Sequence, residues 1–216
     1  MANSKNESLR KKYERATMPI GALFAKIGLT PNMVTALSIL VAIISLYFFY
    51  MRIILYAFVI ILIAGILDIL DGAVARATGK TSKFGTLLDN TADRIVEGII
   101  IIGLIMADLV SSILATTALL AMFLPSYIRA RGEAELRVNA RGIGIVERKE
   151  KMAILFGIII IAYLRPDIPS VYIFVGSVSV SDLLLIILII GSSISALQRI
   201  LFFRGIKKRK INNKSF

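Results

Sequence analysis

Six long apolar runs, almost free of charge, constrain the fold of this chain more than any other feature of its sequence. They cover residues 33–50, 53–67, 98–107, 109–125, 152–164 and 183–197. A helix of about 20 apolar residues crosses the hydrocarbon core of a bilayer, whereas soluble domains bury shorter and periodic apolar groups. The 216 residues are 57% hydrophobic, with a mean hydropathy of +0.81. We therefore expect an all-α polytopic membrane protein, a bundle of six transmembrane helices without a soluble domain.

The expected helices extend these runs into their polar flanks. We predict spans over about 31–51, 53–77, 84–107, 109–136, 147–164 and 181–203. An amphipathic helix over 4–27 should precede them in the headgroup plane, because its apolar side chains stand among Lys and Arg. Residues 1–30 then form a cytoplasmic interfacial segment, 204–216 form a basic cytoplasmic tail, and 1–216 form one membrane domain. Residues 170–177 are either a separate piece or the start of the last helix.

The distribution of basic residues predicts topology and argues against nucleic-acid binding, although the net charge is +12. Lys and Arg number 6 in residues 1–30, 3 in 76–83, 7 in 129–151 and 7 in 199–214. Only Arg52 and Arg165 fall at the opposite helix ends. By the positive-inside rule both termini face the cytoplasm, which agrees with six spans in the cell membrane. The basic segments would also attract anionic lipid headgroups.

Four carboxylates in or beside the second and third spans are the strongest functional signal. Asp68 and Asp71 are three residues apart and Asp89 and Asp93 are four apart, so each pair shares a helix face. An aspartate in the bilayer costs about 2.5–3.5 kcal/mol on insertion scales, which marks such residues as functional. Four close carboxylates need a compensating cation, and hard divalent ions prefer oxygen ligands. On these residues alone, interhelical ion pairs and a cation-coupled transporter remain alternatives.

The chain has no histidine and no cysteine. The commonest general base and the commonest soft metal ligands are therefore absent, and acid–base chemistry near neutral pH falls to Asp, Glu, Lys or Tyr.

The carboxylates belong to a longer pattern. It reads Asp68-x-x-Asp71-Gly72-x-x-Ala75-Arg76 and, after eight residues, Gly85-x-x-x-Asp89-x-x-x-Asp93. This pattern resembles the signature of the CDP-alcohol phosphotransferase family, and the six-helix layout around it is also similar. The resemblance implies a homodimeric enzyme of phospholipid biosynthesis. Such an enzyme transfers a phosphatidyl or archaetidyl group from a CDP-lipid to an alcohol and releases CMP.

The resemblance also implies roles for matching residues. Asp68, Asp71 and Asp89 would hold Mg²⁺ or Mn²⁺, with two ions in the site. Asp93 would contribute to one ion and act as the catalytic base. The residues implied to bind the CDP-lipid are Pro31, Asn32, Met33, Val34, Gly72, Ala75, Arg76, Ser82 and Gly85.

A second polar cluster points to the acceptor. Residues 126–133 read Ser-Tyr-Ile-Arg-Ala-Arg-Gly-Glu, and Glu147-Arg148 follows. Arginine suits phosphate because its guanidinium can bond two oxygens at once. The cluster resembles the inositol-phosphate branch of the family, with Gly132 a mild departure from the usual alanine, and this implies an acceptor-phosphate site made by Arg129, Arg131, Arg148 and Arg199. Glycerol 3-phosphate remains an alternative acceptor, and a pure topology role remains an alternative for the arginines.

Overall fold

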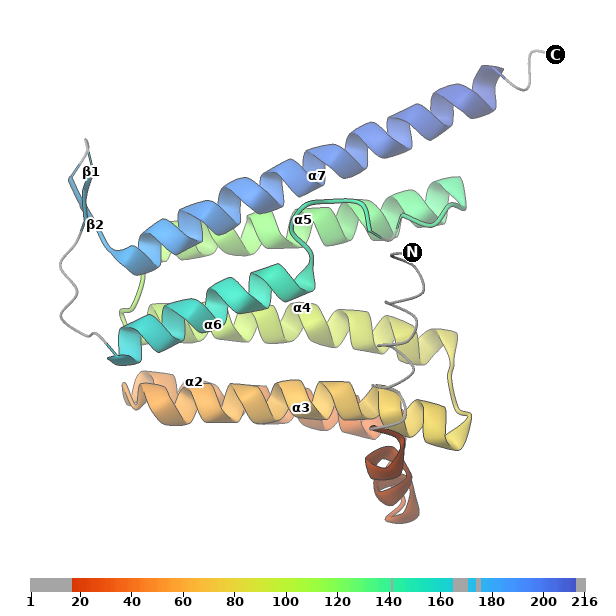
Figure 1. The fold of residues 1–216 in the computed structure, drawn as a ribbon, viewed down its shortest axis with the longest axis horizontal. Coiled ribbons are helices and arrows are strands. Elements are labelled where there is room, and N and C mark those ends of the chain that lie inside the picture. The colour runs from red at the N-terminus through yellow and green to blue at the C-terminus, as the bar shows by residue number, and fades with distance from the viewer. Residues whose placement is uncertain (1–16, 141, 165–170, 174–175, 213–216) are drawn as a thin grey trace, which may run out of the picture. The chain divides into compact units, whose positions relative to one another are not determined.

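A computed structural model describes residues 17–140, 142–164, 171–173 and 176–212 (Figure 1). The described residues form a short helix over 17–26 and six long helices. The long helices are α2 (Pro31–Tyr50), α3 (Ile54–Thr78), α4 (Lys83–Met106), α5 (Ser112–Leu136), α6 (Arg148–Leu164) and α7 (Val180–Asn212). Two short strands, β1 (Val171–Ile173) and β2 (Gly176–Val178), pair antiparallel between α6 and α7.

The six long helices lie where the apolar runs predict them, with differences of at most about three residues except at the end of α7. The all-α expectation is confirmed, and residues 171–173 and 176–178 add a short antiparallel strand pair that was not predicted. These residues form a separate β-hairpin and do not begin α7. The last helix is longer than predicted, since α7 continues to Asn212 and does not end near residue 203. Lys and Arg are good helix formers, so the basic composition of this segment does not end the helix.

Within the part of the chain that the structure describes, four helices are long and apolar enough to cross a membrane: α2, α3, α5 and the part of α7 from Val180 to Ile206. The other two long helices are not in this group, because α4 carries four charged residues from Asp89 to Glu97 and α6 has only 17 residues. Large apolar side chains are exposed on the outer faces of the helices; Leu40 and Tyr47 on α2, for example, are 59% and 60% exposed. Such faces suit lipid rather than water. The chain is a helical membrane protein.

The chain divides into two compact units, residues 1–100 and 101–216, each described here by itself. In unit 1, α2 and α3 pack along their lengths. The buried face of α2 is built from small or polar residues, among them Thr35, Ser38, Ala42 and Ser45. Their size allows close approach of the two backbones, as is usual between membrane helices. Thr30 caps α2 by accepting a hydrogen bond from the backbone N–H of Met33, and Pro31 occupies the first turn.

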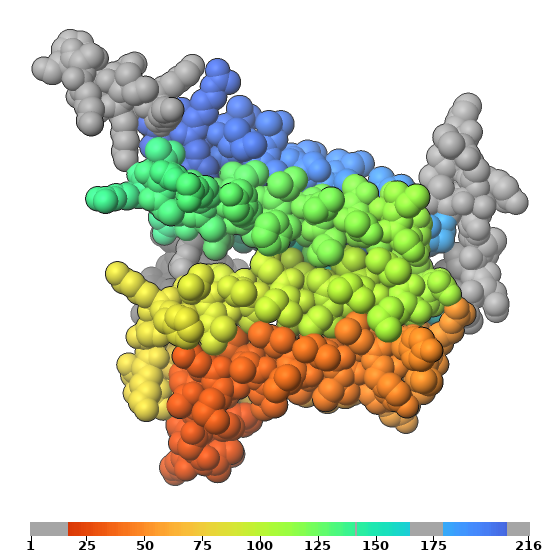
Figure 2. All heavy atoms as spheres, turned by 180° about the vertical axis from the view of Figure 1, so that it is seen from behind, coloured from red at the N-terminus to blue at the C-terminus, as the bar shows by residue number. Residues whose placement is uncertain are grey.

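The helix over residues 17–26 lies crosswise to α2 and α3 at one end of unit 1 (Figures 1 and 2). The chain leaves this helix through Gly28, which has a φ of 87°. The N–H groups of Gly28 and Leu29 donate to the carbonyls of Ala25 and Phe24, which satisfies carbonyls of the last turn. A Cβ built on Gly21 would lie 2.5 Å from the carbonyl carbon and oxygen of Ala73. Glycine at this position therefore lets the helix rest directly on the backbone of α3. The rest of the predicted amphipathic helix, residues 4–16, lies outside the described residues.

In unit 2, α5 and α6 each pack against α7. Residues 143–146, which precede α6, are held against α7 by hydrogen bonds between their backbone groups and side chains of α7. The N–H groups of Ile145 and Val146 donate to Gln198 Oε1 (3.1 Å) and Ser195 Oγ (2.9 Å). Arg199 Nε donates to the carbonyl of Ile143 at 2.7 Å. This loop is therefore a defined part of unit 2.

Substitution of Gly21 tests the contact between the N-terminal helix and α3. Gly21→Ala should lower the melting temperature in detergent, because a Cβ against backbone atoms can be accommodated only if the helix moves away. Overpacking of this kind costs about 1–3 kcal/mol. Gly65→Ala on α3 is the matched control, since a Cβ there meets nothing within 4 Å. Equal melting temperatures for the two variants would contradict the contact.

Candidate active site

Three of the predicted carboxylates converge. One oxygen of each of Asp68, Asp71 and Asp89 lies within 4.8 Å of the other two. Asp68 and Asp71 share a face of α3, and Asp89 stands on α4, which follows after a short turn. Gly79, with a φ of 64°, ends α3 in the left-handed conformation that lets the chain reverse. Asp71 is buried, and the other two are partly buried.

This arrangement fits a divalent cation. Three carboxylates at such distances repel one another in a low-dielectric environment. Their oxygens also form the hard donor set that Mg²⁺ and Mn²⁺ prefer. The residues present therefore suit a bound divalent metal.

A hollow with a cavity volume of about 190 Å³ lies beside the carboxylates, wholly in unit 1. We call it the donor pocket, after the ligand that the sequence pattern leads us to expect there. It is lined by the first turns of α2 and α4 and the C-terminal half of α3, through Pro31, Asn32, Thr35, Asp71, Gly72, Ala75, Arg76, Lys80, Thr81, Ser82, Gly85, Thr86 and Asp89.

The donor pocket also has features that suit an anionic ligand. The positive ends of two helices, α2 and α4, meet there together with Arg76 and Lys80. A Cβ on Gly72 would lie 3.2 Å from Arg76 Nη1, so glycine leaves room for the guanidinium over the helix backbone. The hydroxyl of Ser82 accepts a hydrogen bond from the N–H of Gly85 at 2.9 Å. Its own proton can still be donated to a ligand.

Seven of the nine residues predicted to bind the CDP-lipid line the donor pocket, and Met33 and Val34 do not. Val34 is fully buried against Leu70 and Val74 in the core between α2 and α3. Met33 is half exposed. Each helical residue is rotated by about 100° from the one before, so four consecutive residues cannot all face one pocket. Four lining residues escaped the sequence analysis: Thr35, Lys80, Thr81 and Thr86.

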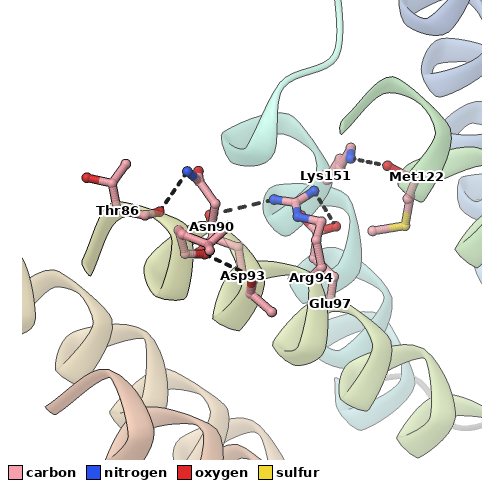
Figure 3. Close-up of polar contacts among 9 residues, drawn as sticks. Thr86, Asn90, Asp93, Arg94, Glu97, Met122 and Lys151 are labelled. Carbon is pink, nitrogen blue, oxygen red and sulfur yellow. Dashed lines mark hydrogen bonds and ion pairs between the residues drawn. The ribbon is translucent and has the colours of Figure 1, made fainter. Parts of the chain in front are cut away.

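Asp93 lies on α4 beside Arg94 and Glu97 (Figure 3). It stands one turn beyond Asp89 on the same helix face and is not among the three converging carboxylates. Arg94 lies beside it, with Nη2 3.6 Å from Asp93 Oδ2. The other guanidinium nitrogen pairs with Glu97 Oε2 at 2.8 Å. Glu97 is only 2% exposed, and it continues the spacing of four residues set by Asp89 and Asp93. That spacing could have identified Glu97 from the sequence.

The four predicted acceptor arginines all lie in unit 2 but differ in surroundings. Arg129 and Arg131 are two residues apart on α5, so their side chains leave the helix in nearly opposite directions. Arg131 is 67% exposed and pairs with Glu135 at 2.8 Å, whereas Arg129 is less exposed and lies 3.9 Å from Glu133. Arg148 begins α6. The geometry therefore separates Arg131 from Arg129.

Two buried cations bind backbone carbonyls near Pro125, the proline inside α5. Arg199, 5% exposed, donates through Nη1 to the carbonyl of Pro125 at 2.5 Å. Lys151 of α6, 2% exposed, donates through Nζ to the carbonyl of Met122 at 2.7 Å (Figure 3). Arg199 also holds the loop at Ile143. It thus joins α5, the loop and α7 around one guanidinium.

Gly132 is more constrained than a mild departure from alanine. A Cβ at this position would collide with the ring of Phe203 on α7. Phe203 is itself buried. Glycine at 132 and a large aromatic at 203 therefore form a matched pair between α5 and α7.

The chain is similar to known proteins of one family. The model of the family described as CDP-alcohol phosphatidyltransferase matches residues 28–198. The archaetidylinositol phosphate synthase of Pyrococcus horikoshii is 37% identical over 148 residues, which cover 68% of this chain and 78% of that protein. The phosphatidylinositol phosphate synthase of Mycobacterium tuberculosis is 34% identical over 154 residues, covering 68% of this chain and 70% of that protein.

Solved structures of a phosphatidylinositol phosphate synthase from Mycobacterium tuberculosis share the fold. The structure with bound CDP-DAG has a TM-score of 0.72 and 28% sequence identity, covering 88% of this chain and 94% of that one. The structure in complex with manganese and citrate has a TM-score of 0.70, also at 28% identity, covering 87% and 88%.

The pairing of Gly132 with Phe203 can be tested by a double-mutant cycle. Gly132→Ala should lower the melting temperature, by an amount that corresponds to about 1–3 kcal/mol of overpacking. In the background of Phe203→Leu the same alanine should cost much less, because the ring that it meets is gone. Additive effects of the two substitutions would show that the residues do not interact.

Proposed function

Because the chain belongs to the CDP-alcohol phosphatidyltransferase family, we propose that this membrane enzyme transfers the phospholipid group of a CDP-lipid to the hydroxyl of inositol phosphate. The observation that carries the proposal is the convergence of Asp68, Asp71 and Asp89 at the edge of a pocket that also holds Arg76. Carboxylates and cationic groups side by side suit a metal-bound diphosphate. Family members of this kind act in phospholipid biosynthesis.

The donor pocket would hold the CDP part of the donor. Asp68, Asp71 and Asp89, with Asp93 contributing, would bind two Mg²⁺ or Mn²⁺ ions, which when bound neutralise charge on the phosphate oxygens. Arg76 and Lys80, which line the same pocket, would contact the diphosphate. The small residues Gly72, Ala75 and Gly85 would leave space for the nucleotide in the donor pocket. Pro31, Asn32 and Ser82 would form walls of the pocket around it. The bound CDP-DAG in the mycobacterial structure supports a donor of this class.

The reaction is a displacement at the lipid-side phosphorus. The acceptor hydroxyl oxygen forms a new bond to this phosphorus, and the bond from phosphorus to the bridging oxygen breaks, so CMP leaves with that electron pair. Asp93 would accept the proton of the attacking hydroxyl, since the chain offers no histidine. Arg94, 3.6 Å from Asp93, would keep this carboxylate oriented along α4. Arg76 would stabilise the charge that develops on the leaving phosphate.

Inositol phosphate is favoured as the acceptor by two observations. Several relatives are named as archaetidylinositol or phosphatidylinositol phosphate synthases. Unit 2 also presents Arg129 and Arg148, which could bind a phosphate group. Arg131 and Arg199 are less suited, because Arg131 is exposed and paired with Glu135 and the buried Arg199 already donates to the carbonyls of Pro125 and Ile143. The relatives include synthases of archaetidyl and of phosphatidyl lipids, so an ether-linked archaetidyl donor and a diacyl donor are equally compatible with this similarity.

The arrangement in the cell membrane follows from charge and length. We infer six spans, α2 to α7, with both termini in the cytoplasm, because basic residues gather on one side of the helices. The helix over 17–26 would lie in the headgroup plane, which its crosswise orientation in unit 1 supports. A homodimer is proposed from the family resemblance.

Release of CMP from a CDP-lipid tests the function directly. Purified enzyme should release CMP with inositol 1-phosphate as acceptor, and much less with glycerol 3-phosphate, inositol or serine. Chelation should abolish activity, and Mg²⁺ or Mn²⁺ should restore it. Preference for glycerol 3-phosphate would overturn the acceptor assignment while leaving the transferase intact. Transport of cations without CMP release would overturn the transferase itself.

The acceptor site can be tested by comparing two neighbouring arginines. Arg129→Gln should raise the KM for inositol phosphate about 10- to 100-fold, because a hydrogen bond to a charged group contributes about 1.5–3 kcal/mol. Arg131→Gln, the matched control on the same turn of α5, should change it by less than about 3-fold. The KM for the CDP-lipid should stay constant in both variants. Equal effects of the two substitutions on the acceptor KM would refute the distinction.

A further inference from the structure

Thr35 of α2 makes a side-chain hydrogen bond to Asp71, a member of the carboxylate cluster on the neighbouring helix α3. Its hydroxyl donates to Asp71 Oδ2 at 2.5 Å, and the residue is 3% exposed. The carbonyl of Pro31 lies 3.1 Å from the same hydroxyl. A hydroxyl has a single proton, and a carboxylate is a stronger acceptor than a neutral carbonyl. The proton therefore lies toward Asp71.

Other buried hydroxyls on this face of α2 behave differently. Ser38 donates to the carbonyl of Thr35 at 2.7 Å, and Ser45 donates to the carbonyl of Ala42 at 2.6 Å. Both bonds stay within α2, as is usual for serine in a membrane helix. Thr35 instead crosses to α3. Packing of the two helices alone would not require this bond, since Ser38 and Ser45 occupy the same face without one.

The bond restricts the Asp71 side chain. A carboxylate can rotate about its last bond and present either oxygen. The hydrogen bond from Thr35 to Oδ2 therefore limits how the carboxylate can turn toward a cation. Hydrogen bonds to ligating carboxylates fix their orientation in metal sites, and their loss typically costs 10- to 100-fold in metal affinity.

We infer that Thr35 is a positioning residue for the metal site, which it serves by holding Asp71 in the orientation that binds the cation. This inference rests on the proposed metal-binding role of the carboxylate cluster. It also gives α2 a function in the site beyond its first turn. Pro31 and Asn32 line the donor pocket one turn before Thr35, so one helix end would place both the nucleotide contacts and a metal ligand.

The test measures Mn²⁺ binding to the purified, substrate-free protein by electron paramagnetic resonance of the free ion. Thr35→Val keeps the size of the side chain and removes the hydroxyl. It should raise the dissociation constant for Mn²⁺ about 10- to 100-fold. Thr35→Ser, which retains the hydroxyl, should restore affinity to within about 3-fold. Ser45→Ala is the matched control, a buried hydroxyl of α2 removed away from the cluster, and should leave binding unchanged.

Several outcomes separate this inference from its alternatives. Wild-type affinity in Thr35→Val overturns it, and so does an equal loss in Ser45→Ala, which would indicate a general effect of helix packing. If Thr35→Val does not fold, Thr35→Ala is read against Thr35→Ser by the same criterion. A wild-type protein that binds Mn²⁺ no better than Asp71→Asn removes the metal site and the inference together. Mn²⁺ binding without CMP release overturns the proposed reaction and leaves the role of Thr35 to be decided by the binding series.

Discussion

Three carboxylates repel one another within 4.8 Å in unit 1, on helices whose outer faces are apolar. This repulsion sets the requirements that the rest of unit 1 meets. Such a cluster needs a cation, and it needs neighbouring groups that hold its oxygens in place. Small residues on the facing sides of α2 and α3 allow the backbones to approach. The same close packing brings Thr35 into hydrogen-bond distance of Asp71. Charge and helix packing are thus two parts of one arrangement.

Much of the fold was predictable because the bilayer imposes a length and a composition on each span. The boundaries of α2 to α7 follow from the apolar runs and from capping residues such as Thr30 and Gly79. The hairpin of β1 and β2 was not predictable, because a strand of three residues leaves no periodic pattern to read. The helical tail after residue 203 was missed because a basic segment can be solvated either as helix or as coil.

Site residues that follow a regular helical spacing could be predicted from the sequence. Residues whose role depends on the direction in which they leave the helix could not. The carboxylates of α3 and α4 share faces by spacing alone, and three of them converge. Val34 and Thr35 are adjacent, yet one packs into the apolar core and the other reaches Asp71. A buried polar residue on an apolar helix was the available signal for Thr35. The arginines of α5 give a second example, because Arg129 and Arg131 are two residues apart and leave the helix in different directions, into different surroundings.

The division of the chain into two units has an evolutionary consequence. Every residue that lines the donor pocket falls between positions 31 and 89, whereas the arginines proposed to bind the acceptor fall between 129 and 199. Substitutions that alter acceptor choice can therefore accumulate in one stretch of sequence while the other stays under unchanged selection for the activated lipid. A lineage could exchange one polar headgroup for another and keep its chemistry. The phospholipid composition of a membrane could then diversify through drift in the C-terminal half of a single gene.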